Sequence, residues 1–320
     1  MKTIKKTLAV GPEISNMPSW NWVGKDTAKE LSKYYNVITF RSLEKIPNCD
    51  FLMLVKHPLK KINIQTIKSK GTKVLYCPID FYHNENQLKE DLNFLSNCDA
   101  IALHCERWIP FFEKINNNVH FVEHHSKFSL QEINSYKKDG FVLWIGSFQY
   151  VPFLLDYIKK NSINYELRIC SDLKNERAKN GAEKLCRELR LSMQISEDYN
   201  TTNGIKSHVW SEEVQRELME QAKAAIDIKS VTHFSQCHKP PTKAQKYVSS
   251  GIPFAINKES YSYEYFMKRG LTLAEPFDTD KLFSHEYWLE TSEFSKKLKP
   301  QISIINVGLK YKEIYENPKK

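Results

Sequence analysis

The chain alternates short apolar runs with amphipathic stretches, and it does so in two successive series separated by a polar interval. Buried strands of the first series are predicted where Val, Ile, Leu and Phe gather, at Thr7–Val10, Asn36–Phe40, Asp50–Val55, Lys73–Cys77, Ala100–His104 and His120–Glu123. Helical patterns lie between them, at about 24–35, 62–69, 85–96 and 106–116. Continuous apolar strands that alternate with helices predict a parallel sheet covered by helices on both faces.

The second series begins at Gly140-Phe-Val-Leu-Trp-Ile-Gly146. Its further strands are expected near 165–170, 192–195, 224–228, 252–256 and 271–274, and its helices near 151–160, 174–189, 211–222, 242–250 and 260–269. A last amphipathic stretch, about 301–316, predicts a terminal helix.

The two series predict an α/β chain with two Rossmann-like parallel-sheet domains that face each other across a cleft. We expect domains at 1–128 and 139–300, a linker at 129–138, and a C-terminal segment, 301–320, whose helix packs back on the first domain. Ligands of such sheets bind at the carboxyl ends of the strands. A single large α/β domain is the alternative.

Composition is that of a soluble globular protein, with 41% hydrophobic and 27% charged residues and no apolar run long enough to span a membrane. The apolar stretch at the amino terminus is interrupted by Gly11-Pro12, which favours a first buried strand over a signal peptide. The seven cysteines are scattered without a Cys-x-x-Cys pair. They indicate a reducing, cytoplasmic location with neither a disulfide framework nor a zinc site.

The formal net charge of +9 favours phosphate-bearing ligands, an anionic membrane surface or nucleic acid, although solubility alone explains it equally well. The sequence contains neither G-x-G-x-x-G nor G-x-x-x-x-G-K-[ST]. These absences argue against a nicotinamide-dependent dehydrogenase and a P-loop kinase.

The most informative segment runs from His238 to Ile256. Pro240 and Pro241 end an extended loop, Thr242 is the expected N-cap of the next helix, and Gly251 is placed to close it. Amides at the start of that helix, with Lys239 and Lys243 beside them, would form a diphosphate site. A capped helix with solvated lysines accounts for the same residues.

This segment resembles the donor-site helix of the GT-B glycosyltransferases. The resemblance rests on Lys239-Pro-Pro-Thr-Lys243 and on Ser249-Ser-Gly-Ile-Pro253, because a small-small-Gly-x-Pro stretch ends that helix in many members. Further likenesses lie at Trp210–Val214, Leu218–Ile228, Val74–Asp80, Leu95–Asp99, Ala100–Leu103 and His120–His125. The resemblance implies a nucleotide-sugar co-substrate, no bound cofactor and no metal.

The chain departs from the family where retaining members carry a Glu-x7-Glu pair, since it has His238 and Lys246 at those positions. The ribose contact usual in the family is therefore in question, and Lys239, Lys243 and Lys246 could hold a diphosphate or the carboxylate of an acidic sugar. Other candidate donor contacts are Gly146, Ser147 and Trp210. A simple strand-to-helix turn would explain the first two residues, and burial against the following helix would explain Trp210.

Catalytic candidates come from predicted strand ends in the first domain. If the reaction inverts configuration, a carboxylate or histidine there must accept the proton of the acceptor. Asp80 is the preferred candidate, with Glu13 and His104 as the others; a cap, a turn residue and a buried histidine are their structural explanations.

These patterns favour a metal-independent glycosyltransferase acting on a glycan, a lipid-linked saccharide or a nucleic acid, with peripheral membrane contact compatible with the charge. Two alternatives share the scaffold: a non-catalytic nucleotide- or nucleic-acid-binding module, which the missing Glu pair supports, and a nucleotide-sugar epimerase. The sequence does not specify the base, the sugar, the acceptor, the stereochemistry, the catalytic base or the oligomeric state.

Overall fold

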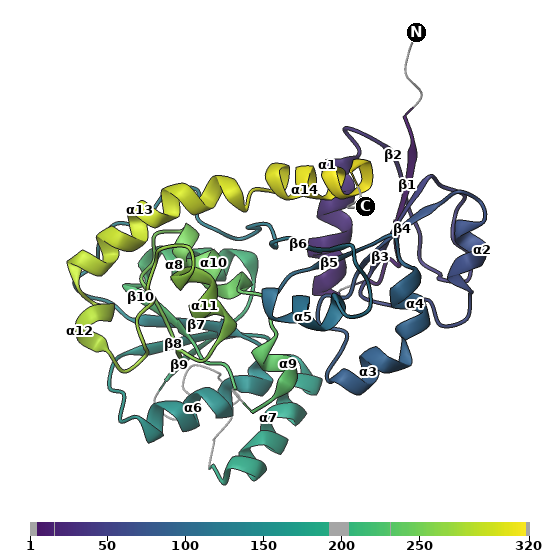
Figure 1. Ribbon diagram of the computed structural model, residues 1–320. Coiled ribbons are helices and arrows are strands. Elements are labelled where there is room, and N and C mark those ends of the chain that lie inside the picture. Colours follow the sequence, from purple (N-terminus) through teal and green to yellow (C-terminus); the bar gives the residue numbers. More distant parts are fainter. Residues whose placement is uncertain (1–4, 16, 192–204, 231, 318–320) are drawn as a thin grey trace. The chain divides into compact units, whose positions relative to one another are not determined.

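The computed structural model describes residues 5–15, 17–191, 205–230 and 232–317 (Figure 1). They form two compact units. The first comprises Met1–Lys127, Thr232–Pro240 and Pro300–Lys320, and the second comprises Phe128–Val231 and Pro241–Lys299.

The first unit is built on a six-stranded sheet in the order β2-β1-β3-β4-β5-β6. The strands are β1 (Thr7–Gly11), β2 (Asn36–Thr39), β3 (Phe51–Val55), β4 (Lys73–Cys77), β5 (Ala100–Leu103) and β6 (Val119–Phe121). Every neighbouring pair is parallel. The six predicted strands of the first series are present, and the continuous apolar runs of β3, β4 and β5 suit burial on both faces. The prediction that β2 is buried is wrong, because β2 is an exposed strand at the edge of the sheet.

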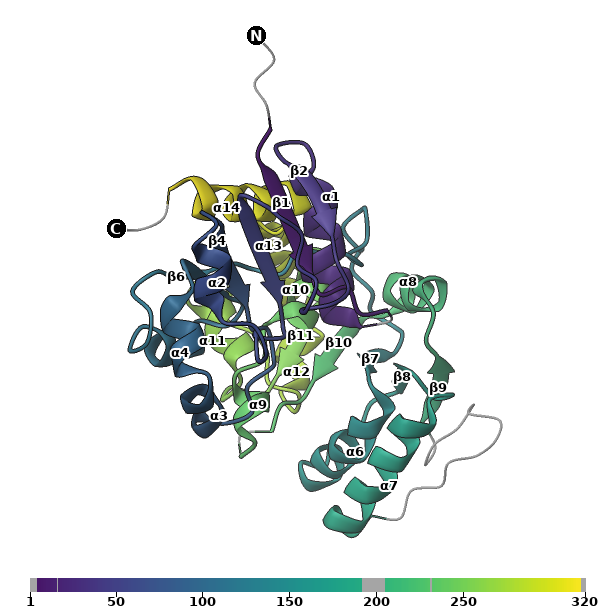
Figure 2. The ribbon, with the colours of Figure 1, turned by 90° about the vertical axis from the view of Figure 1, so that its right-hand side faces the viewer.

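Short helices flank this sheet. They are the π-helical η1 (Trp20–Asp26), α1 (Thr27–Leu31), α2 (Ile64–Lys68), α3 (Glu85–Glu90), α4 (Leu92–Asn97), the 3₁₀ turn η2 (Glu106–Trp108), α5 (Ile109–Phe112), α9 (Phe234–Cys237) and α14 (Ile304–Glu316). Figure 2 shows α2 and α4 on one side of the sheet and α1 on the other. The strands supply the core between them, and every residue of β3 is buried.

The last helix, α14, packs on α1 within the first unit (Figure 1). A Cβ at Gly308 would lie 2.6 Å from Cγ of Glu30, so the absent side chain permits the close approach of the two helices. Tyr315 then reaches the sheet, where its ring packs on Phe51 at a centroid distance of 4.9 Å.

The second unit is built on a five-stranded sheet in the order β11-β10-β7-β8-β9. The strands are β7 (Val142–Gly146), β8 (Leu167–Ser171), β9 (Lys206–Val209), β10 (Ala224–Asp227) and β11 (Phe254–Ile256), again all parallel. Its helices are η3 (Phe148–Tyr150), α6 (Val151–Lys160), α7 (Glu176–Leu189), α8 (Glu212–Gln221), α10 (Thr242–Ser249), α11 (Tyr261–Met267), α12 (Thr279–Leu282) and α13 (His285–Gln301).

Helix α10 ends as the sequence predicts. Gly251 has a φ of +70°, and its N–H donates to Val248 O at 3.0 Å while the N–H of Ile252 donates to Tyr247 O at 3.1 Å. This is the hydrogen-bond pattern of a Schellman motif, in which glycine is preferred because its backbone is left-handed.

The polar segment 129–138 packs against the carboxyl end of α10. Leu130 N–H donates to Ser250 Oγ at 2.9 Å, and Asn134 N–H donates to Ser250 O at 2.8 Å. A Cβ at Gly251 would lie 2.3 Å from Cγ2 of Ile133, so this glycine is required for close packing as well as for its φ. The segment is therefore held in place by backbone hydrogen bonds despite its polar composition.

The predicted strand at 192–195 lies outside the described residues. Other parts of the second series differ from the prediction, and β9, at Lys206–Val209, was not expected. The strand predicted at 271–274 is wrong, because the chain there makes only an isolated bridge, Ala255 to Ala274. The sequence patterns also missed α13, whose apolar residues follow no strong helical period and whose last turn contains Pro300.

All seven cysteines are free thiols. None of the described helices is long and apolar enough to cross a membrane.

Candidate functional site

The carboxyl ends of β7 and β10 are neighbours in the second sheet. Gly146 ends β7 and Asp227 ends β10, and helix α10 begins beyond the loop that follows β10. The parallel topology therefore brings a glycine, a carboxylate and the start of a helix to one edge of the sheet.

Asp227 organises this edge. Its side chain is 2% exposed, and Oδ1 accepts hydrogen bonds from Lys243 Nζ at 3.1 Å and from Trp144 Nε1 at 3.2 Å. Lys229 Nζ forms an ion pair with Oδ2 at 2.6 Å. The Lys243 ammonium also lies over the Trp144 ring, 4.7 Å from its centroid. Two lysines and an indole thus hold one buried carboxylate in a fixed position.

The charge state of Asp227 follows from these contacts. Burial raises the pKa of its carboxyl, but the charges and hydrogen bonds of Lys229 and Lys243 outweigh burial and lower the pKa to about 2. Asp227 is therefore ionised at neutral pH, and its negative charge keeps two ammonium groups at the sheet edge.

Gly146 makes room for the ammonium group. A Cβ at this position would lie 2.5 Å from two atoms of the Trp144 ring and 2.8 Å from Lys243 Nζ. Any larger residue would displace one of them, so glycine is needed here for the close approach of the backbone.

Helix α10 begins one residue earlier than predicted. Pro241 occupies the N-cap position, and its carbonyl accepts from the N–H of Gln245 at 2.8 Å. The predicted capping role of Thr242 is wrong, because Thr242 is the first helical residue. The ring of Pro241 has no oxygen with which to cap the first-turn amides.

Lys246 lies on the same helix and is almost completely buried. It is 9% exposed, its Nζ donates to Gln215 Oε1 at 2.9 Å, and the ammonium lies 5.5 Å from the centroid of the Phe128 ring. Burial lowers the pKa of this lysine to about 8, although the nearby Asp227 opposes the shift. At pH 7 it still carries a proton and adds a buried positive charge.

Two other predicted donor contacts, Ser147 and Trp210, form side-chain hydrogen bonds within the second unit. Ser147 Oγ donates to Asp172 Oδ2 at 3.2 Å, as expected of a strand-to-helix turn. Trp210 is not buried against α8: its ring is 41% exposed, and its Nε1 donates to Gln215 Oε1 at 3.2 Å. Gln215 therefore links Trp210 with Lys246.

His238 and Lys239 group with the first unit rather than with α10. The His238 ring packs against Trp108 and Phe234, with centroid distances of 4.6 and 4.3 Å, and its Nδ1 lies 2.7 Å from Phe234 O. Lys239 contributes to the electrostatic environment of Asp80. The predicted donor segment is thus divided between the two units after Pro240.

Asp80 lies beyond the carboxyl end of β4 and is 42% exposed. Its Oδ1 accepts from Lys56 Nζ at 2.7 Å. Partial burial raises the pKa of the carboxyl, but Lys56 and Lys239 together lower it below the ordinary value. Lys56, and Ile79 just before Asp80, have a left-handed backbone with φ of 68° and 56°. The backbone that carries this ion pair is therefore strained in both segments.

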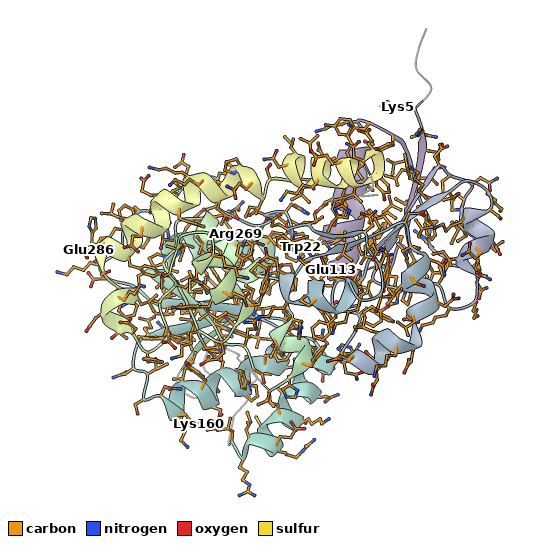
Figure 3. The ribbon with its side chains drawn as sticks, viewed as in Figure 1. Lys5, Trp22, Glu113, Lys160, Arg269 and Glu286 are labelled. Carbon is orange, nitrogen blue, oxygen red and sulfur yellow. The ribbon has the colours of Figure 1, made fainter. Side chains whose placement is uncertain are left out.

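His104 follows β5 and is 2% exposed. Its Nδ1 lies 2.7 Å from Val122 O, which makes Nδ1 the protonated nitrogen; Nε2 has no hydrogen-bond partner among the described residues. Burial lowers the pKa of this imidazole to about 4. The His124 ring packs 4.3 Å from His104 and stacks on Trp22. Figure 3 labels Trp22 among the side chains of the first unit.

Glu13 lies after β1, where its carboxylate is 30% exposed and 3.7 Å from Arg41 Nε. Because Glu13 follows β1, it lies at the same edge of the first sheet as Asp80 and His104, and Asp80 acts electrostatically on His104.

No model of a known protein family and no curated protein matches the chain. Solved structures do match. AviGT4, a glycosyltransferase involved in avilamycin A biosynthesis, has a TM-score of 0.60 at 10% identity, with 98% of each chain covered. WaaG, a glycosyltransferase involved in lipopolysaccharide biosynthesis, has a TM-score of 0.53 at 10% identity, covering 97% of this chain and 99% of that one. The chain has the GT-B fold.

A third match is longer than this chain. The pneumococcal O-GlcNAc transferase GtfA, solved with UDP and GlcNAc, has a TM-score of 0.50 at 12% identity. The alignment covers 83% of this chain but 56% of GtfA.

The sequence patterns did not indicate three residues of the candidate donor site in the second unit: Asp227, Lys229 and Gln215. The position of Asp227 at the end of the apolar run Ala224-Ala-Ile-Asp227 was a usable signal, because parallel strands present their carboxyl ends to ligands. Lys229 and Gln215 carry no comparable signal. Among the residues that the structure describes, no group of three or more His, Cys, Asp or Glu side chains is placed to bind a metal ion.

Proposed function

We propose that this protein is a glycosyltransferase that uses a nucleotide-sugar donor and binds the donor diphosphate at the edge formed by Gly146, Asp227 and α10. The observation that carries the proposal is the buried Asp227 cluster, in which one carboxylate holds Lys229 and Lys243 beside a glycine. The fold shared with AviGT4 and WaaG supports it.

The electrostatics of the cluster suit a diphosphate. Three lysines, 229, 243 and 246, face a single carboxylate, so positive charge is in excess near the sheet edge. Lys243 is 29% exposed and Lys229 is 13% exposed, so Lys243 is the more accessible of the two ammonium groups. We assign it to the diphosphate, together with the amides of the first turn of α10.

Such a site would act mainly on the leaving group. Negative charge grows on the diphosphate as the glycosidic bond breaks, and ammonium groups already fixed by Asp227 stabilise that charge without reorganisation. This chemistry needs no bound metal or cofactor, which is the mechanism we propose. The UDP in the GtfA structure makes UDP the first nucleotide to test.

For an inverting reaction, we assign acceptor deprotonation to Asp80. Its carboxylate is exposed and ionised, whereas His104 is almost completely buried. The free thiols fit a cytoplasmic location, which we also propose. The acceptor would be a glycan, a lipid-linked saccharide or a nucleic acid.

A thermal-shift screen against UDP, GDP, CMP, ADP and their sugars tests donor binding. We expect one nucleotide to stabilise the protein and Lys243→Ala to abolish that stabilisation. Lys160→Ala is the matched control, because Lys160 is an exposed lysine of the same unit, at the end of α6 (Figure 3). Nucleotide stabilisation that survives Lys243→Ala would refute the assignment of the diphosphate site.

A turnover assay separates the proposal from its alternatives. A transferase consumes the nucleotide-sugar and transfers the sugar to an acceptor, and EDTA should leave the rate unchanged. Binding without any consumption would instead indicate a non-catalytic module. Conversion without an acceptor would indicate an epimerase.

A further inference from the structure

The first unit contains a cavity of about 560 Å³ at the carboxyl edge of its sheet. Its walls come from the segments that follow four neighbouring strands: Pro12 and Ile14 after β1, 41–44 after β2, 57–62 after β3, and Phe81 after β4. A volume of this size is typical of pockets for small ligands.

Most of the lining is apolar. The side chains that provide it are Pro12, Ile14, Leu43, Pro58, Leu59, Ile62 and Phe81. The floor includes Leu59, which is 6% exposed. A ligand that fills the cavity must therefore present an apolar body to these walls.

Three cationic side chains, Arg41, Lys60 and Lys61, also line the cavity, against one carboxylate, Glu44. Arg41 and Lys61 are each 79% exposed. Arg41 is 3.7 Å from Glu13, and Lys61 is 2.6 Å from the exposed Glu44. Because exposed ion pairs contribute little free energy, both cations can exchange these partners for a ligand. Lys60 is held differently, by the buried carboxylate of Asp91.

His57 also lines the cavity. Its ring packs edge-on against Phe81 at a centroid distance of 5.8 Å, and its Nε2 is shielded from solvent without a hydrogen-bond partner among the described residues. Burial and the nearby Lys56 lower the pKa of this imidazole, so it is neutral at pH 7. Because Nε2 is shielded from solvent, the His57 ring adds surface to the cavity wall rather than a hydrogen bond to a ligand.

We propose that this cavity binds a phosphate or carboxylate group carried on an apolar body, with the anion at Arg41 and Lys61 and the apolar body against Leu59 and Phe81. The inference deepens the proposed function and rests on it in one respect: the bound molecule would be the acceptor, or the anionic carrier of the acceptor sugar.

Isothermal titration of the full chain with octyl phosphate, octyl glucoside and inorganic phosphate tests the two halves of this chemistry. Octyl phosphate should bind at least about tenfold more tightly than either of the others, because each of them lacks one half of the ligand. Equal affinities for octyl phosphate and octyl glucoside would refute the anionic site. Equal affinities for octyl phosphate and inorganic phosphate would refute the apolar one.

The double variant Arg41→Glu with Lys61→Glu should weaken octyl phosphate binding at least about tenfold. Its matched control is Lys29→Glu with Lys70→Glu, which makes the same charge change on exposed lysines of the same unit away from the cavity. Circular dichroism and melting temperature confirm that both variants fold. Equal loss in the two double variants would overturn the proposal.

Sedimentation with vesicles distinguishes two sources of the ligand. Binding to phosphatidylglycerol but not phosphatidylcholine vesicles, lost in the Arg41/Lys61 variant, would identify a membrane lipid. Binding of octyl phosphate without sedimentation would identify a free molecule. Both outcomes support the proposed chemistry.

Turnover of the nucleotide-sugar, measured on the same preparations, keeps the two proposals separable. Loss of all nucleotide turnover with octyl phosphate binding retained would refute the transferase and not the cavity. Turnover with no octyl phosphate binding would refute the cavity alone.

Discussion

The carboxyl edges of the two sheets carry similar residue types but use them differently. At the second sheet, Asp227 is 2% exposed and forms ion pairs with Lys229 and Lys243. At the first sheet, exposed Arg41 pairs with the partly buried Glu13 and exposed Lys61 pairs with the exposed Glu44, and both cations line an apolar cavity. The difference is therefore in burial rather than in charge.

Burial decides what each edge can do. A buried pair interacts strongly and is costly to disrupt, so the second edge is preorganised for one kind of anion. An exposed pair is screened by water and rearranges at little cost, so the first edge can adapt to its ligand. We infer that the second edge supplies fixed electrostatic stabilisation and the first supplies selectivity.

The largest effect on stability is expected from Asp227→Asn. Removing one partner of a buried ion cluster leaves two ammonium groups without a counter-charge, and the free energy of unfolding should fall by about 3 kcal/mol. Urea denaturation at pH 7 measures this loss. Asp156→Asn is the control: it should cost less, because the partner Lys160 is 69% exposed and returns to water.

The same variant has a defined pH dependence. Because the folded pKa of Asp227 is lowered to about 2, its contribution is fully present above the unfolded value of about 4 and is lost as pH falls through 2. The difference between wild type and Asp227→Asn should therefore shrink over that range. A constant difference down to pH 2 would contradict the assigned ion cluster.

A gain in stability is expected from Lys246→Met. Burial lowers the folded pKa of Lys246 from 10.5 to about 8, so the charged lysine destabilises the native state below pH 8. Removing it should raise the free energy of unfolding at pH 7 by about 3 kcal/mol. The difference should decrease as pH rises from 8 to 10.5, because the native lysine then loses its proton. Lys160→Met is the exposed control, and a destabilised Lys246→Met would show that the lysine serves the fold.

A smaller loss is expected from Gly146→Ala. The new methyl group would contact the Trp144 ring and Lys243 Nζ, which should cost about 1–2 kcal/mol and weaken nucleotide binding. Gly71→Ala is the comparison, because that position has a φ of +84° but no atom within 4 Å of the added Cβ. It should lose stability through strain and keep its nucleotide affinity. Identical nucleotide binding by the two variants would argue against close backbone approach at Gly146.

No measurable effect on stability is expected from Lys61→Ala. Lys61 and Glu44 are 79% and 57% exposed, so the melting temperature should be unchanged. A decrease similar to that of Asp227→Asn would remove the contrast between the two edges.

Much of the fold could be predicted because its signals are local. Apolar runs such as Phe51–Val55 predict a strand without knowledge of its neighbours, and Gly251 closes α10 through its own left-handed backbone. Helix α13 could not be predicted, because its apolar residues do not follow a regular helical period. The segment 271–274 has strand composition but forms only one bridge.

The candidate site was harder to predict than the fold. Lys243 and Lys246 were proposed from their helix, and Gly146 from its strand. The partner that unites them, Asp227, lies 16 residues before Lys243 along the chain, and only the packing of β10 beside β7 brings it to them. His238 and Lys239 looked contiguous with α10, yet the chain passes to the other unit after Pro240.

The sequence by itself determined the alternation of strands and helices, the two parallel sheets and the glycine that ends α10, because these depend on the periodicity and backbone freedom of neighbouring residues. Tertiary structure alone decided which charges are buried. Asp227 and Glu44 are both carboxylates in the sequence, but one is enclosed by β7, β10 and α10 while the other stays in water. Since the strength of a charge depends on its exposure, the chemistry of the two edges could be read only from the folded chain.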